Sequence, residues 1–294
     1  MSIKHIIQLL RPEQWAKNGF IFLPMFFSGQ LLNTTMQLSC LVACIAFSLA
    51  ASSIYCFNDI YDADSDRSHP TKRKRPVASG ALSIKTAYAV MAICLILSML
   101  ILFIFGGKQW NIVMALIVSY YIMNIAYCIR LKRYAIIDVM VISTGFVLRI
   151  MVGGTATGVW LSEWIVIMTF LLALFLAFAK RRDDVVLYQN TGILYRENTS
   201  RYNLDFLNQV MTVVSTITII AYIMYTVSPD VIERFQSSYV YLTAIFVLAG
   251  IIRYLQVTIV YLKSGNPTKI LLGDRFTQCC IVGWIVSFLI IIYL

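Results

Sequence analysis

Apolar stretches separated by short polar segments follow one another along the whole chain of 294 residues. A helix that crosses a bilayer needs about 20 mostly apolar residues. Nine predicted spans lie at about 19–33, 38–57, 84–105, 110–129, 135–155, 161–179, 207–227, 238–262 and 277–294. The pattern predicts an all-α, polytopic membrane protein with nine transmembrane helices, which form a single helical domain over residues 1–294.

The composition agrees with this prediction. The chain is 60% hydrophobic and only 13% charged, whereas soluble domains are about 25% charged. The N-terminal segment has no short apolar core followed by small residues, so we expect no cleaved signal peptide. The composition does not indicate an oligomeric state.

The net charge of +10 is distributed unevenly between the two sides of the predicted bundle. The N-terminus and the segments after the second, fourth, sixth and eighth spans carry 20 of the 24 Lys and Arg residues. Because cytoplasmic loops of membrane proteins are enriched in Lys and Arg, we expect a cytoplasmic N-terminus, an external C-terminus and insertion in the inner (cytoplasmic) membrane. The charge thus reflects topology and a cytoplasmic anion site, and we expect no nucleic acid partner.

An acidic segment, Asn58 to Asp66, follows the second predicted span directly. On a helix, Asp59, Asp62 and Asp66 fall at i, i+3 and i+7, so their carboxylates share one face. Carboxylates suit a hard cation such as Mg²⁺, which takes phosphate oxygens as further ligands. We therefore expect a magnesium site at the cytoplasmic side, in a polar cavity. The alternative is a solvated acidic helix end beside a basic loop.

Two basic segments lie on the same predicted side. The loop Lys72-Arg73-Lys74-Arg75 follows the acidic segment, and cations beside a metal–carboxylate site suit a pyrophosphate; part of this charge also serves orientation. Before the first span, Arg11, Gln14 and Lys17 are spaced to reach toward phosphate. An equally good interpretation of these three residues, with Trp15, is an anchor at the membrane surface.

A lone arginine, Arg149, lies in the middle of the fifth predicted span. Such a residue must face the bundle interior and be paired, but Asp138 is eleven positions away and too distant to be its partner. Arg149 is therefore either structural or substrate-binding. The glycines that follow it, Gly153, Gly154 and Gly158, are expected to permit close helix packing.

A second charged cluster, Lys180-Arg181-Arg182-Asp183-Asp184, ends the sixth span. Lys180 and Asp184 are i, i+4 neighbours, so a surface salt bridge is one interpretation. The other is a second wall of the polar cavity, covered by the long polar segment from Tyr188 to Tyr202. The seven cysteines lie in or beside apolar spans without metal-ligand spacing, so we expect neither zinc nor disulfides.

The acidic segment and its trailing loop resemble the first aspartate-rich motif of the UbiA superfamily of intramembrane prenyltransferases. The residues concerned are Asn58-Asp59-x-x-Asp62-x-x-x-Asp66, Arg75-Pro76 and Ser79-Gly80. Within that superfamily the chain more closely resembles the branch of decaprenyl-phosphate phosphoribosyltransferases. Three segments carry this resemblance: Leu10-Arg11-Pro12-x-Gln14-Trp15-x-Lys17-Asn18, Val147-Leu148-Arg149 with Gly153-Gly154, and Lys180 to Asp184. The second aspartate motif of ordinary prenyltransferases, a DxxxD pattern, is absent, because Asp183 and Asp184 are adjacent.

The resemblance implies a Mg²⁺-dependent transferase that moves a 5-phosphoribosyl group from phosphoribosyl pyrophosphate to a polyprenyl phosphate and releases pyrophosphate. It implies catalytic roles for Asp59, Asp62 and Asp66, which with Asn58 would hold the metal. The implied substrate-binding residues are Lys17, Gln14, Asn58, Arg73, Arg75, Lys132, Arg149, Lys180, Arg181 and Asp184. Of these, Lys17, Arg73 and Arg75 are expected to bind phosphate, and Lys180, Arg181 and Asp184 the ribose end of the donor.

Two other functions remain open from the sequence. One is a prenyltransferase that consumes a prenyl diphosphate and an aromatic or other acceptor. The other is a transporter, which would be expected to carry charged residues near the midplane of several spans and inverted repeats; here most acidic residues cluster at one side of the predicted bundle.

Overall fold

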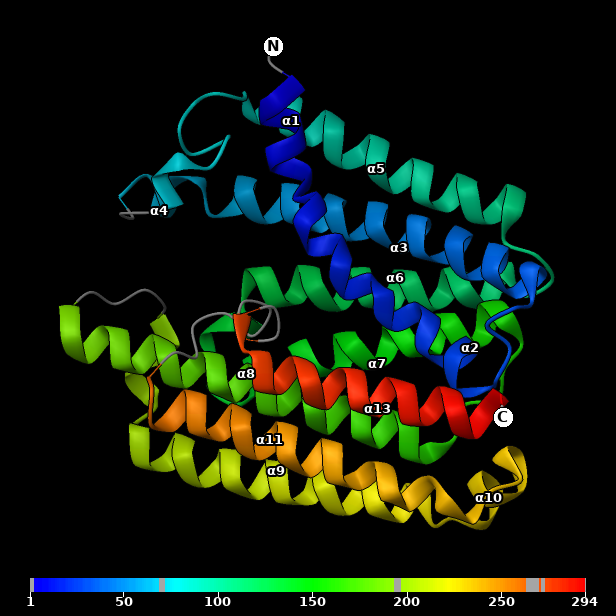
Figure 1. The fold of residues 1–294 in the computed structure, drawn as a ribbon. Coiled ribbons are helices and arrows are strands. Elements are labelled where there is room, and N and C mark those ends of the chain that lie inside the picture. Colours follow the sequence, from blue (N-terminus) through cyan, green and yellow to red (C-terminus); the bar gives the residue numbers. More distant parts are fainter. Residues whose placement is uncertain (1–2, 69–71, 193–196, 263–269, 271–272, 294) are drawn as a thin grey trace. The chain divides into compact units, whose positions relative to one another are not determined.

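Helices are the only regular elements in the described part of the computed structural model, residues 3–68, 72–192, 197–262, 270 and 273–293 (Figure 1). Seven of the described helical segments are long and apolar enough to cross a membrane: Thr34–Tyr61, Ile84–Phe105, Trp110–Ile129, Ile137–Thr157, Glu163–Thr191, Leu204–Thr226 and Ser238–Ile259. They match the second to eighth predicted spans. The all-α membrane class is thereby confirmed, and the total of nine spans stays a prediction.

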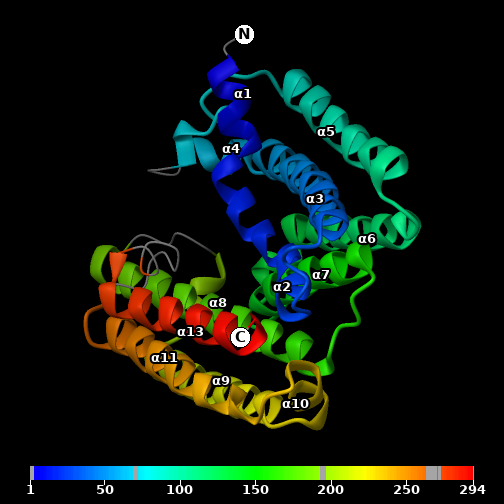
Figure 2. The same ribbon diagram turned by 45° about the vertical axis from the view of Figure 1, so that its right-hand side comes forward.

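The first predicted span, 19–33, does not form one long helix. The N-terminal region instead forms three consecutive helices, α1 (Ile3–Leu10), the 3₁₀ helix η1 (Pro12–Phe22) and α2 (Leu23–Phe27), and only the end of η1 and α2 fall within the predicted span. In both views they follow one another across α3 (Thr34–Tyr61) (Figures 1 and 2). The last predicted span, 277–294, falls on α13 (Arg275–Tyr293), within which Arg275–Ile291 forms a shorter apolar helix.

The chain divides into two compact units. The first unit comprises Met1–Lys132 and Gly145–Leu161, and the second comprises Arg133–Thr144 and Ser162–Leu294. The boundary falls inside α7 (Ile137–Thr157), so this helix contributes residues to both units.

The first unit is built around α3, which packs against α5 (Ile84–Phe105), α6 (Trp110–Ile129) and η1. Small residues on α3, among them Ala43, Ala46 and Ala50, are buried and allow close approach of the neighbouring helices. Two hydrogen bonds join α3 to α5: Ser98 Oγ donates to the Ala46 carbonyl at 2.7 Å, and Ser53 Oγ to the Met91 carbonyl at 2.9 Å.

Glycines at the end of α7 and just after it illustrate two different uses of this residue. A Cβ atom at Gly153 would lie 1.9 Å from the Ile21 carbonyl oxygen, so this glycine permits η1 to contact α7 and the expectation of close packing is confirmed. At Gly158 that expectation is wrong. A Cβ there would meet no atom within 4 Å, and the residue has a φ of +72°, which glycine adopts at low cost.

The second unit contains α8 (Glu163–Thr191), α9 (Leu204–Thr226), α11 (Ala244–Ile259) and α13, with the shorter elements η4 (Glu197–Arg201), α10 (Pro229–Phe235) and η5 (Ser238–Thr243). Helix α9 packs against both α8 and α11, as Figure 1 shows for the α9–α11 pair. Buried residues from all three helices, including Phe175, Leu207, Met211 and Tyr254, share one core.

Polar side chains mark where several of the long helices begin. Asn33 caps α3, Ser83 caps α5, Ser162 caps α8 and Asn203 caps α9, each accepting a hydrogen bond from a backbone N–H in the first turn. These caps satisfy donors that a helix leaves unpaired at its N-terminus. The capped helices begin within about four residues of the first residues of the corresponding predicted spans.

Candidate active site

The acidic segment lies at the junction of two helices in the first unit. Helix α3 ends at Tyr61, Asp62 is its C-cap, and α4 (Ala63–Arg67) begins directly afterwards. Asp59 and Asp66 are 1% and 2% exposed, whereas the Asp62 side chain is 18% exposed. The predicted single helical face is therefore interrupted at Asp62, and the three carboxylates do not form one uniform row.

Each of these carboxylates is bound by a cation from a different part of the first unit. Arg11 Nη2 donates a hydrogen bond to Asp59 Oδ1. Arg75 Nη1 donates to Asp66 Oδ2 at 2.6 Å and lies 3.5 Å from Asp59 Oδ1. Lys132 Nζ donates to both oxygens of Asp62, at 2.6 and 2.8 Å. We call these six residues, Arg11, Asp59, Asp62, Asp66, Arg75 and Lys132, the ionic cluster.

The position of Arg11 depends on the break between α1 and η1. Arg11 has a φ of +52°, a left-handed conformation that directs the chain from one helix into the next. Its guanidinium also lies 5.2 Å from the centre of the Tyr55 ring, a cation–π arrangement. Ser52 Oγ donates to the Leu10 carbonyl at 2.8 Å and accepts from Trp15 Nε1 at 2.9 Å. Helix α3 thus holds the residues on both sides of Arg11.

Buried residues fix the loop that carries Arg75. Val77 and Leu82 pack with Leu9 and Ala63 in a small core beneath this loop. The Arg75 N–H donates to the Lys72 carbonyl at 2.9 Å, which closes a turn at the end of η2 (Lys72–Lys74). Arg73 lies in the same turn and is exposed. The fold therefore directs one of the two predicted loop arginines to the aspartates.

The donor atoms of the ionic cluster suit a divalent cation. Within the described residues, no group of three His, Cys, Asp or Glu side chains is close enough together to hold a metal ion. However, Asp59 Oδ2 is buried and has no hydrogen-bond partner, and a buried oxygen of this kind is costly unless a ligand satisfies it. Asp62 is partly exposed and can exchange Lys132 for another cation. The residues present thus fit Mg²⁺, with carboxylate oxygens as ligands.

The remaining predicted residues of the N-terminal region and of α3 lie at or near the surface of the first unit. Asn58 and Gln14 are half-buried, and Lys17 is exposed. Their roles as metal or substrate ligands stay predictions.

Arg149 is 5% exposed and lies in a cage of neutral partners. Its guanidinium donates to Asn18 Oδ1 at 2.8 Å, to the Gly145 carbonyl at 2.7 Å and to the Tyr120 hydroxyl at 3.1 Å. It also lies 4.8 to 5.2 Å from the ring centres of Phe47, Tyr120 and Phe146. Asn18 Nδ2 in turn donates to Ser48 Oγ at 2.8 Å. Arg149 therefore ties η1 to α3, α6 and α7, as expected for a paired residue that faces the interior.

The second charged cluster lies in the second unit and has a partner that sequence reasoning missed. Arg181, 1% exposed, donates from Nε to Asp138 Oδ2 at 2.5 Å and from Nη1 to Asp184 Oδ2 at 3.1 Å. Tyr202 donates to Asp138 Oδ1 at 3.1 Å. Lys180 is exposed on the same helix. Lys180, Arg181 and Asp184 are the predicted substrate-binding residues of this cluster, and two of them, Arg181 and Asp184, form an ion pair with each other.

The segment predicted to cover the site is partly helical. Helix α8 continues to Thr191 and ends at Gly192, which has a φ of +67°. Residues 193–196 of the predicted cover lie outside the described residues. After η4, Tyr202 is 7% exposed, so this end of the segment is packed into the second unit.

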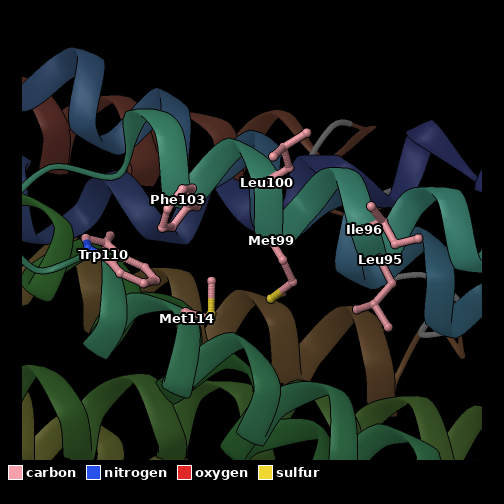
Figure 3. Close-up of a pocket in the computed structure, with 7 residues that line it drawn as sticks. All are labelled: Leu95, Ile96, Met99, Leu100, Phe103, Trp110 and Met114. Carbon is pink, nitrogen blue, oxygen red and sulfur yellow. The ribbon is translucent and has the colours of Figure 1, made fainter.

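An apolar groove lies between α5 and α6, apart from these charged clusters. It is lined by Leu95, Ile96, Met99, Leu100 and Phe103 on α5 and by Trp110 and Met114 on α6 (Figure 3). Its lining is almost entirely apolar, so it offers no ligand for a phosphate or a metal. It suits a hydrocarbon chain.

Comparison with known proteins identifies the family. A family model described as the UbiA prenyltransferase family matches residues 20–270. The chain belongs to this family. Decaprenyl-phosphate phosphoribosyltransferase of Corynebacterium glutamicum is 30% identical over 98% of the chain and 87% of that protein. Its counterpart in Mycolicibacterium smegmatis is 31% identical over 96% of the chain and 91% of that protein. The resemblance on the sequence motifs is thereby confirmed.

Solved structures of UbiA proteins share the fold of this UbiA-family chain. A UbiA homologue from Archaeoglobus fulgidus bound to DMAPP and Mg²⁺ superposes with a TM-score of 0.69 at 18% identity, over 98% of each chain. The same homologue bound to GPP and Mg²⁺ gives a TM-score of 0.67 at 18% identity, over 99% of this chain and 100% of that one. Together with the seven long apolar helices, this establishes an integral membrane protein.

Proposed function

We propose that this protein transfers a 5-phosphoribosyl group from phosphoribosyl pyrophosphate to a polyprenyl phosphate and releases pyrophosphate. The similarity to decaprenyl-phosphate phosphoribosyltransferases across nearly the whole chain carries this proposal. The chemistry of the ionic cluster supports it, because carboxylates are ligands that Mg²⁺ prefers and the cations paired with them suit phosphate oxygens.

In this reaction the anomeric C1–O bond of the donor breaks, and the leaving pyrophosphate gains negative charge. Asp59, Asp62 and Asp66, with Asn58, would hold Mg²⁺, which supplies charge neutralisation on the leaving group when bound. Arg75 and Lys132 neutralise the carboxylates in this structure, and in the complex they would bind pyrophosphate oxygens instead. Such contacts accelerate the reaction if they become stronger in the transition state, in which negative charge develops on the leaving pyrophosphate.

The acceptor needs little activation. The phosphate oxygen of a polyprenyl phosphate is already an anion, so a strong general base is not required and positioning is the main contribution of the protein. Lys17 and Arg73, both exposed in the first unit, are proposed to bind phosphate groups at the membrane surface. The apolar tail has surfaces such as the groove of Figure 3 available to it. Discrimination of tail length is expected to be weak, because each added methylene contributes little.

The proposed topology places this chemistry at the cytoplasmic side of the inner membrane. Nine spans with a cytoplasmic N-terminus would place the acidic segment, the loop with Arg75 and the cluster at Arg181 on the same side. The excess of Lys and Arg in these segments supports this orientation. Cysteine-accessibility labelling at Ser65 and at Gln236 would test it, with Ser65 accessible only from the cytoplasm.

A second candidate is a prenyltransferase, since the solved UbiA structures of Archaeoglobus fulgidus hold the prenyl diphosphates GPP and DMAPP. The two functions differ in the donor that is consumed. Purified protein would be incubated with Mg²⁺, a polyprenyl phosphate and phosphoribosyl pyrophosphate labelled in the ribose. Labelled lipid supports the proposal. A parallel incubation supplies a prenyl diphosphate in place of phosphoribosyl pyrophosphate, and its consumption, with no labelled lipid in the first incubation, would favour the prenyltransferase.

A further inference from the structure

The cluster around Arg181 contains two residues, Asp138 and Tyr202, that have no role in the function proposed above. Asp138 is fully buried at the start of α7, and its two carboxylate oxygens have different partners: Arg181 on one and the Tyr202 hydroxyl on the other. Arg181 also holds Asp184, three residues along α8. The four residues therefore form one chain of hydrogen bonds in the order Tyr202, Asp138, Arg181, Asp184.

Exposure increases sharply at one end of this chain. The side chains of Asp138 and Arg181 are 0% and 1% exposed, and that of Asp184 is 16% exposed. A ligand can therefore reach Asp184 but not the charges behind it.

Tyr202 holds a backbone segment as well as a carboxylate. Its hydroxyl accepts a hydrogen bond from the Ile136 N–H at 2.6 Å and donates to Asp138. Ile136 has a φ of +69°, a conformation that is unfavourable for a β-branched residue and persists only where its surroundings hold it. Burial raises the pKa of Tyr202 to about 12, so the hydroxyl stays protonated and remains a donor at neutral pH. Tyr202 thus fixes both the turn before α7 and the orientation of Asp138.

We propose that Asp138 and Tyr202 are positioning residues, which act through Arg181 to present the Asp184 carboxylate to the vicinal hydroxyl groups of a ribose. The inference rests on the proposed function for its donor. A carboxylate accepts hydrogen bonds from neighbouring hydroxyls, as acidic residues do with the ribose of dinucleotides. A divalent cation is a poorer occupant, because the adjacent guanidinium repels it.

The test measures preference for the 2-hydroxyl directly. Full-length protein in detergent is titrated with ribose 5-phosphate and with 2-deoxyribose 5-phosphate, and the two Kd values are compared. Because loss of a hydrogen bond to a charged group weakens binding by roughly tenfold, the wild type should prefer ribose 5-phosphate by about that factor. Asp184→Asn should abolish most of the preference. Tyr202→Phe, which removes one hydroxyl, should reduce it at least about threefold.

Tyr222→Phe is the matched control. Tyr222 is also a buried tyrosine of the second unit with its hydroxyl in a network, to Thr243 at 2.6 Å and Trp284 at 2.7 Å. It should lose thermal stability as Tyr202→Phe does, but keep the wild-type preference. If Asp184→Asn keeps the wild-type preference for ribose 5-phosphate, the proposal is wrong. It is also wrong if Asp184→Asn loses this preference while Tyr202→Phe keeps it. Wild-type protein with no preference also overturns it. Ribose binding with preference but without transfer would refute the proposed function alone.

Discussion

Lys132 and Asp62 lie 70 positions apart in the sequence, and the Lys132 ammonium contacts both oxygens of the Asp62 carboxylate. An ammonium in this position competes with a metal ion for the same two oxygens. If Asp62 binds Mg²⁺ as proposed above, Lys132 must leave the carboxylate when the metal binds. Metal binding by this protein should depend on how strongly the lysine is held.

Replacement of Lys132 by methionine should tighten Mg²⁺ binding while weakening donor binding. The pair is partly exposed and contributes at most about 1 kcal/mol, so the Mg²⁺ affinity should rise by up to about fivefold. The KM for phosphoribosyl pyrophosphate should rise several-fold, because a phosphate cation is lost. The midpoint of the Mg²⁺-dependent rise in Tm measures the first effect. Arg67→Met, which disrupts only the exposed pair with Asp64, should change neither quantity.

Asp62→Ala should reduce transfer by at least about 100-fold, because a metal ligand and its charge are removed. The Tm should change little, since the side chain is partly exposed. Asp64→Ala is the control: its side chain is 94% exposed, two residues away on the same segment, and it pairs with Arg67. Activity retained in Asp62→Ala, or lost equally in Asp64→Ala, would show that the metal assignment is incorrect.

Gly153→Ala should destabilise the first unit by about 3 kcal/mol, the upper end of the usual cost of overpacking a core. The added Cβ would lie 1.9 Å from the backbone oxygen of Ile21, so one helix must move, and such overpacking is costly. Gly250→Ala is a comparable change in α11, where the nearest atom, Cys280 Cβ, would be at 3.7 Å. It should be neutral or slightly stabilising, because alanine favours helix. Thermal unfolding in detergent compares the two; equal Tm values would contradict the close contact.

Asp274→Asn should lower the Tm by about 2–4 °C at neutral pH, because it removes the negative charge that pairs with Arg253, an interaction of about 1 kcal/mol, while asparagine can still cap the helix. Asp274 caps α13 through the Thr277 N–H at 2.9 Å and binds Arg253 through both oxygens. The hydrogen bonds from Arg253 hold the pKa of Asp274 well below its usual value of 3.8.

The pH dependence of this effect has a definite sign. A carboxyl group whose pKa is lower in the folded state stabilises the protein fully above its unfolded pKa, and the stabilisation is lost as the pH falls. The Tm deficit of Asp274→Asn should therefore be equal at pH 7 and pH 5 and smaller at pH 3. A deficit that grows toward acid pH would contradict the ion pair.

Most of the fold was predictable because long apolar segments can satisfy their backbone in a bilayer only as helices. The second to eighth spans follow from this rule alone. The end of α8 was not predictable from hydropathy. The apolar span was predicted to end at 179, but the helix continues to Thr191, because polar residues outside the bilayer can also form a helix. The division of the first predicted span between η1 and α2 was also missed, because hydropathy does not distinguish a 3₁₀ helix from an α-helix.

The acidic half of the site was also predictable, since Asp59, Asp62 and Asp66 lie in one short segment. Their partners were not. Arg11 precedes Asp59 by 48 positions, and no spacing rule joins them. Asp138 was considered only as a partner for Arg149 on its own helix. Its actual partner, Arg181, lies 43 positions away on α8, and only the tertiary structure brings the two together.

The pairing of Arg11 with Asp59 also has a consequence for biosynthesis. The ribosome completes Arg11 before Asp59, whereas Arg75 and Lys132 emerge after it. The acidic end of α3 can therefore enter the translocon with a counterion already present on the preceding segment. A nascent chain that ends before Arg75 should insert its first two hydrophobic segments stably, and the same truncation with Arg11→Ala should insert them poorly.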